Sequence, residues 1–124
     1  MNRASAQRLP DYLQHMVDAI SRIQRYLSHV SETGFMGDEK TQDAVVRNFE
    51  VIGEAARHVQ TMHEDYAAAH PEVPWGLMYA MRNRVAHGYF QVDWNLIWRT
   101  AHGELPALRE QIERLLAGLP PGVR

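Results

Sequence analysis

The stretch QDAVVRNFEVIGEAAR, Gln42–Arg57, decides the fold class. Its apolar residues recur every three or four positions, a spacing that places them on one face of an α-helix. The stripe continues to Met62, and we expect this helix to begin near Asp38 or Thr41. A mid-helix glycine such as Gly53 costs about 1 kcal/mol relative to alanine, so we expect Gly53 to allow a close crossing with another helix.

An earlier segment has an equally clear helical pattern. Its apolar stripe runs without interruption from Leu9 to Val30, and Pro10 followed by Asp11 suits a helix start. The segments SETGFMGDEK (residues 31–40) and AAAHPEVPWG (residues 67–76) break the periodicity, so both are predicted loops.

Two further helices are predicted in the second half of the chain. One begins near Pro74 or Trp75, and Gly88 is suited to end it as the C′ residue. The last begins after Asp93, a favourable N-cap. Pro106 lies inside the apolar pattern of this last helix and predicts a kink or break near residues 102–105, because proline removes a backbone donor.

These patterns predict an all-α fold, an up-down bundle of four main helices with the last one kinked or broken near Pro106. No alternating strand pattern is present. The length of 124 residues fits one domain, residues 1–124, with an ordered core of about residues 9–119. The apolar stripes are long enough to leave surface for a partner, most simply a second copy in a homodimer.

Composition excludes several classes of function. The chain has no cysteine, which excludes disulfides, zinc–thiolate sites and thiol catalysis. It has no apolar run of about 18 residues and no stretch of signal-peptide type, so we expect a cytoplasmic protein without a membrane partner. The net charge is −2, so any nucleic acid would bind to a local basic patch.

A metal site is the first candidate chemistry. Glu50, Glu54 and His58 follow one another at intervals of four on one helix face. Bundle di-metal sites use a Glu-x-x-His spacing repeated on partner helices, and this chain has neither that spacing nor a second copy. We therefore expect a solvated or partner-facing polar stripe and no metal. No P-loop or dinucleotide motif is present either, so no cofactor is predicted.

The second candidate is a polar cluster at the end of the third predicted helix: Arg82, Asn83, Arg84, His87 and Tyr89. One interpretation is structural, because cations near a helix C-terminus gain about 0.3–1 kcal/mol from the macrodipole. The other is functional. Arginine binds phosphate, histidine transfers protons near neutral pH and asparagine can orient either, and these are the parts of a metal-independent ribonuclease.

The spacing Arg-x-x-x-x-His-x-Tyr, made by Arg82, His87 and Tyr89, resembles the signature of the HepT toxins of the HEPN superfamily. Two blocks, Gln42–Arg57 and Val73–Trp98, are similar to HepT sequence in the same order, and the resemblance covers roughly residues 11–116. It implies a HEPN-like fold and a prokaryotic, homodimeric endoribonuclease toxin of a type VII HEPN/MNT toxin–antitoxin system.

The resemblance also implies residue roles and partners. Arg82 and His87 would be the catalytic pair, and Asn83 a supporting residue. RNA would be the substrate, with no DNA expected. An MntA-type nucleotidyltransferase antitoxin, in a hetero-oligomer with the toxin, would transfer AMP to Tyr89. The bulky anion would then compete for Arg82 and repel the substrate.

Helix geometry leaves the assembly of this site open. Residues five apart on a straight helix point about 140° away from each other, so Arg82 and His87 would not face one another. Either the chain turns at Gly88 and frees the imidazole, or the pair forms across a dimer. Arg84 is three residues from His87 and is a candidate supporting residue.

Two non-enzymatic interpretations also remain. The chain could be a helical module that binds a nucleotidyltransferase and holds nucleotide or phosphate in the Arg/His cluster. It could also be a structural dimer with charged helix ends, in which case substitutions in the cluster would change stability and little else.

Overall fold

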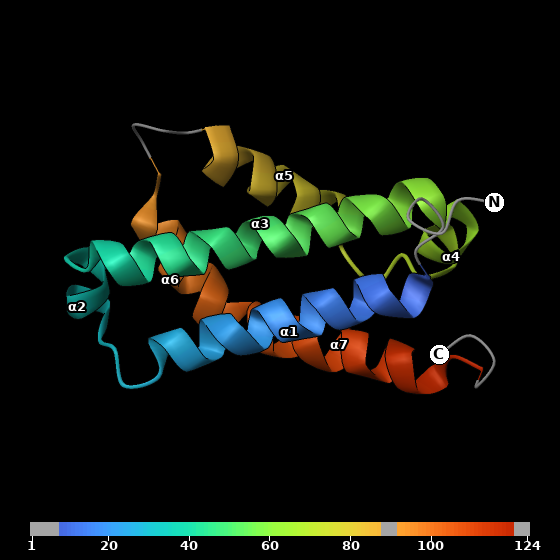
Figure 1. Cartoon of the computed structure of the whole chain (residues 1–124), viewed down its shortest axis with the longest axis horizontal. Helices are drawn as coiled ribbons and strands as arrows, with labels where there is room; N and C mark the ends of the chain where they lie inside the picture. The colour runs from blue at the N-terminus through green and yellow to red at the C-terminus, as the bar shows by residue number, and fades with distance from the viewer. Residues whose placement is uncertain (1–7, 88–91, 121–124) are drawn as a thin grey trace.

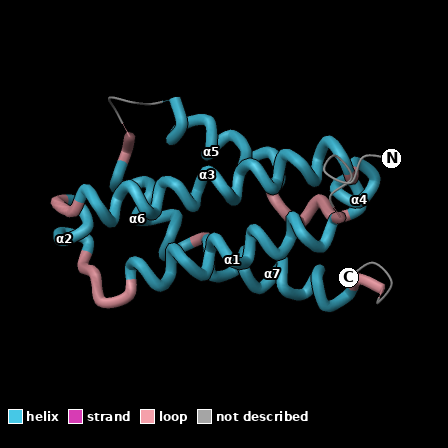
Figure 2. The backbone as a smooth tube through the Cα atoms, viewed as in Figure 1, coloured by secondary structure: helices cyan, strands magenta, loops and turns pink. Residues whose placement is uncertain are grey.

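The computed structural model describes residues 8–87 and 92–120, and for residues 86 and 87 only the backbone. Within these ranges the chain is helical with short connections and no strand (Figure 2). The predicted all-α class is therefore confirmed. The helices, in chain order, are α1 (Leu9–Leu27), α2 (Glu32–Met36), α3 (Glu39–Met62), α4 (Glu64–Ala69), α5 (Trp75–His87), α6 (Trp94–Gly103) and α7 (Leu105–Gly118).

The long helices alternate in direction and form an up-down bundle, as the colour gradient of Figure 1 shows. Helix α3 lies in the middle and has its most extensive contacts with α5 on one side and α1 on the other. Helix α1 also packs against α7, and α6 leads into α7. The four main helices expected from the sequence are thus α1, α3, α5 and the pair α6–α7.

The predicted starts of two helices are confirmed by their caps. The Asp38 carboxylate accepts a hydrogen bond from the Thr41 backbone N–H at 3.1 Å, and α3 begins at the next residue. The Asp93 carboxylate accepts one from the Leu96 N–H at 3.0 Å and starts α6 in the same way. Each cap provides an acceptor for one of the backbone donors that the first turn of a helix leaves unpaired.

The predicted break near Pro106 is also confirmed. Helix α6 ends at Gly103 and α7 begins at Leu105, with Glu104 between them. Pro106 lies in the first turn of α7, where its missing N–H costs no helical hydrogen bond. The Gly88 prediction falls outside the described residues and stays a prediction.

Both predicted loops contain short helices, so those two predictions were wrong in part. Residues 32–36 form α2, which Ser31 caps by accepting a hydrogen bond from the Gly34 N–H at 3.0 Å. The Phe35 side chain of α2 is fully buried. Residues 64–69 form α4, which takes in the first part of the second predicted loop. Helices of five or six residues are too short to show an apolar stripe.

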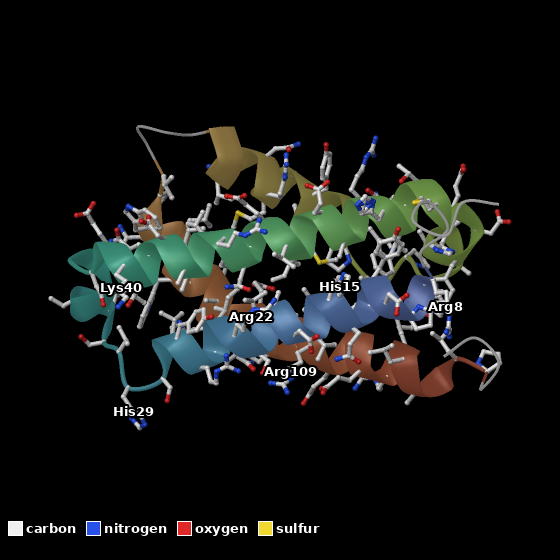
Figure 3. The ribbon with its side chains drawn as sticks, viewed as in Figure 1. Arg8, His15, Arg22, His29, Lys40 and Arg109 are labelled. Atoms are coloured by element: carbon white, nitrogen blue, oxygen red, sulfur yellow. The ribbon has the colours of Figure 1, made fainter. Side chains whose placement is uncertain are left out.

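The buried core residues come mainly from α1, α3, α5, α6 and α7, and the apolar stripes read from the sequence supply most of them. Met62 is an exception, because 42% of its surface is exposed at the end of α3. Hydrogen bonds between polar side chains link neighbouring helices. The Arg22 Nε donates to the Asn48 Oδ1 at 2.7 Å between α1 and α3, and an Arg109 Nη donates to Gln24 between α7 and α1 (Figure 3).

Candidate functional site: an arginine at the α3–α5 crossing

Helices α3 and α5 approach each other closely at Gly53. A Cβ atom added there would lie 2.8 Å from the Met78 carbonyl oxygen and would collide with the Arg82 Cβ. Since real Cβ atoms do not approach other atoms so closely, no residue with a side chain fits without a shift of one helix. The crossing predicted from the mid-helix glycine is therefore confirmed.

Arg82 lies on the face of α5 that packs over Gly53, and its guanidinium is held from two sides. One Nη lies 3.0 Å from an Oε of Glu54 on α3. The other Nη donates a hydrogen bond to the Asn83 Oδ1 at 3.0 Å. The Arg82 side chain is 26% exposed, so the charged end lies at the rim of the helix interface.

The Arg82 Nε behaves differently from the two Nη atoms. It is buried and has no hydrogen-bond partner within the described part of the chain. The Cβ and Cγ atoms of the same side chain lie against the α3 backbone at Gly53. The stem of this side chain thus packs against α3, while the side chain as a whole is partly exposed.

The other predicted site residues are described to different extents. Arg84 is exposed, and Val85, one residue on, is buried. His87 is the last residue of α5 and only its backbone is described. Tyr89 lies outside the described residues. The structure therefore brings Arg82 and Asn83 together, and the combination of Arg82 with His87 stays a prediction.

The polar stripe of α3 divides among separate partners. Glu50 lies 4.0 Å from Arg47 in a weak surface pair, whereas Glu54 pairs with Arg82 across the interface. His58 stacks on the ring of Tyr12 in α1, with 5.0 Å between ring centroids. Among the described side chains, those of residues 8–85 and 92–120, no three His, Asp or Glu residues are grouped closely enough to hold a metal ion.

Tyr12 belongs to a structural contact at the far end of α3. Its hydroxyl donates to the Met62 sulfur at 3.3 Å. Burial, followed by the negative charge of Asp11, raises the pKa of Tyr12 above its ordinary value. A tyrosine held neutral and packed against His58 has no evident part in the chemistry of Arg82.

A second arginine lies on the same side of the α3–α5 interface. The guanidinium carbon of Arg57, on α3, is 5.0 Å from the centroid of the Tyr79 ring on α5. This is within the range of a cation–π interaction. Arg57 and Glu54 are three residues apart on α3, and so are Tyr79 and Arg82 on α5, so the two contacts lie one helical turn from each other.

Glu54 is the residue at this site whose role the sequence alone did not predict. The sequence predicts a solvated or partner-facing stripe for Glu54, because spacing within one helix cannot show which residue of a second helix lies opposite. Its position directly after Gly53, where two helices were expected to touch, was the one available signal.

None of the helices formed by residues 8–87 and 92–120 combines the length and the apolar character needed to cross a membrane.

The fold and the site together define a class of protein. It is an all-helical bundle with an arginine-centred polar cluster at a close helix crossing, followed by a histidine at the end of the same helix. Comparison with known proteins identifies the family within this class. A family model described as "Ribonuclease HepT-like" matches residues 16–115, and this chain belongs to the HepT-like family of the HEPN superfamily. The matched range contains Glu54 and all five predicted site residues.

Individual relatives agree with the family assignment. A Thermococcus cleftensis protein named "Probable ribonuclease HepT" is 37% identical over 105 residues, which cover 85% of this chain and 93% of the relative. A "Putative RNase" of Methanocaldococcus jannaschii is 34% identical over 108 residues, covering 87% and 84%. One from Caldanaerobacter subterraneus is 31% identical over 105 residues, covering 85% and 91%. No solved structure gives a significant match.

Proposed function

We propose that this chain is an endoribonuclease, the toxin of a type VII HEPN/MNT toxin–antitoxin system. The observation that carries the proposal is membership of a family described as ribonuclease, with a match that includes the whole Arg-x-x-x-x-His-x-Tyr spacing. The contacts of Arg82 support it. An arginine whose stem packs against a neighbouring helix and whose side chain is partly exposed is suited to bind a phosphate group.

The proposed reaction needs no metal. The ribose 2′-OH attacks the adjacent phosphorus, the O2′–P bond forms and the P–O5′ bond breaks, leaving a 2′,3′-cyclic phosphate and a 5′-OH end. His87 takes the proton from the 2′-OH and returns one to the leaving oxygen. Arg82 stabilises the negative charge that develops on the phosphoryl oxygens. DNA has no 2′-OH and would not be cleaved by this route.

We assign supporting roles to Asn83 and Arg84. Asn83 accepts a hydrogen bond from Arg82 and so helps to orient the guanidinium. Arg84 is exposed one helical turn before His87 and would add positive charge for the incoming RNA. We also propose that the active form is a homodimer, because positions 82 and 87 lie about 140° apart around the helix axis and a second copy can complete the site.

The cleavage test compares purified wild type with Arg82→Ala and His87→Ala on a short RNA in the presence of EDTA. We expect wild type to cut the RNA but not its DNA equivalent. Loss of the charge-stabilising group should lower kcat by about 10²–10³-fold, and loss of the proton-transfer group by about 10²–10⁴-fold. Light scattering on the same samples should give twice the chain mass of 14.3 kDa.

Arg114→Ala is the matched control, because Arg114 is an exposed arginine on α7, away from α5. It should retain wild-type activity. Full activity of His87→Ala would disprove the mechanism. A wild type that cuts no RNA but binds nucleotide tightly would instead favour the non-catalytic nucleotidyltransferase-binding module.

Tyr89 is proposed as the acceptor of AMP from an MntA-type nucleotidyltransferase antitoxin. The modified tyrosine would place a phosphate two residues from His87, where it competes with RNA for Arg82. Incubation with the partner enzyme and ATP should raise the intact mass by one or more AMP units, with loss of RNase activity. Tyr89→Phe should prevent the gain, and an unchanged gain would place the acceptor elsewhere.

A further inference from the structure

We propose that Glu54 is a positioning residue for Arg82: its carboxylate aims the guanidinium at the scissile phosphate and does not itself touch the RNA. This inference rests on the proposed ribonuclease function and extends it to a second helix. Its basis is the 3.0 Å contact between a Glu54 Oε and an Arg82 Nη across the α3–α5 interface.

The first step of the argument is that the stem of Arg82 cannot move freely. Its Cβ and Cγ lie directly over the α3 backbone at Gly53, in the space that any other residue's Cβ would occupy. Only the guanidinium end can therefore take up different orientations. Whatever contacts that end decides the direction in which its donors point.

The second step is that Glu54 and Asn83 hold the guanidinium on opposite Nη atoms. A guanidinium has five N–H donors, four of them on the two Nη atoms. The two contacts leave two Nη hydrogens for a further acceptor, and the buried Nε is not accessible to one. A phosphate can therefore bind Arg82 while both contacts persist.

The third step is that stability gives no sufficient reason for this pair. The Glu54 side chain is 49% exposed and that of Arg82 is 26% exposed. Ion pairs with so much exposure contribute little to folding, because water screens the charges and the side chains lose conformational freedom. The neighbouring pair of Glu50 with Arg47 is of this surface kind, with a longer contact of 4.0 Å.

The charge of Glu54 predicts how the kinetic constants should respond. A carboxylate near the phosphate opposes RNA binding, so removing it should not weaken the affinity for substrate. Removing it should, however, release the guanidinium from the orientation that stabilises the transition state. The expected result is a lower kcat with an unchanged or slightly lower KM.

The experiment measures kcat, KM and thermal unfolding for full-length wild type, Glu54→Gln, Glu54→Asp and Glu50→Gln with one short RNA. We expect Glu54→Gln to lose at least tenfold in kcat, with KM changed less than threefold and a Tm within about 4 °C of wild type. Glu54→Asp keeps the charge on a shorter arm and should recover part of the loss. Glu50→Gln, one turn away, should stay within twofold of wild type.

Three outcomes would overturn the inference. A Glu54→Gln variant as fast as wild type, or faster, would show that Glu54 does not aim Arg82 or restrains it instead. A loss matched by a large fall in Tm, without recovery in Glu54→Asp, would make the pair structural. If wild type cleaves RNA and Arg82→Ala does not, the ribonuclease function stands, and the Glu54 variants test only the role of Glu54. A wild type without RNase activity overturns the proposed function together with this inference.

Discussion

At the scale of single residues, Gly53 determines how closely α5 can lie on α3. The residue gives up about 1 kcal/mol of helix propensity relative to alanine. Because Gly53 has no side chain, the Arg82 stem can lie against the α3 backbone beside Glu54. The same glycine therefore connects packing in the core with the orientation of the proposed catalytic arginine.

Replacing Gly53 by alanine should destabilise the protein, although alanine is the better helix former. The added methyl would meet the Met78 carbonyl and the Arg82 Cβ, and such overpacking typically costs about 1–3 kcal/mol. Urea denaturation followed by circular dichroism would measure the loss, and kcat should fall with it because Arg82 is displaced. Gly103→Ala is the control, since a Cβ at that position would meet no atom within 4 Å apart from its own helix backbone and chain neighbours. Equal stability of the two variants would contradict the close crossing.

At the scale of secondary-structure elements, the helix caps and the break at proline could be predicted from the sequence, whereas the short helices α2 and α4 could not. These signals act on the backbone within a few residues of their own position, so each could be predicted from one segment. They are the caps at Asp38 and Asp93 and the proline at position 106. Helix α2 is held by contacts from other elements. The Phe35 ring packs against Trp94 and Trp98 of α6, with centroid distances of 6.0 and 5.5 Å.

The buried amide of Gln42 also fastens α2 to α3. Its Nε2 donates to the carbonyl oxygens of Phe35 and Met36 at 2.9 and 3.1 Å. Gln42→Met has a similar shape but no donor, so we expect a loss of about 1–3 kcal/mol in the free energy of unfolding. Gln14→Met, at an exposed position on α1, should change stability by no more than about 0.5 kcal/mol. Matching denaturation midpoints would mean that α2 does not depend on this amide.

At the scale of the whole molecule, α3 is the central helix of the bundle and packs against both α1 and α5. It separates α5 from α1 and α7, so the proposed site lies on the side of the bundle opposite the α1–α7 contact (Figure 1). Leu77 on α5 is 72% exposed, the highest fraction among the large apolar side chains of the described residues. An apolar side chain on the helix that carries Arg82 is consistent with the proposed homodimer, which the light-scattering measurement tests.

The sequence by itself determined the helical class, the long elements and the break at Pro106, and it predicts the polar cluster from Arg82 to Tyr89. These depend on periodicity, capping and spacing, which act between residues a few positions apart. Only the tertiary structure decided that Glu54 on α3 faces Arg82 on α5, 28 positions further along the chain. The physical reason is register: the partner of a side chain on another helix depends on how the two helices slide and turn against each other, and here the contact at Gly53 sets that register.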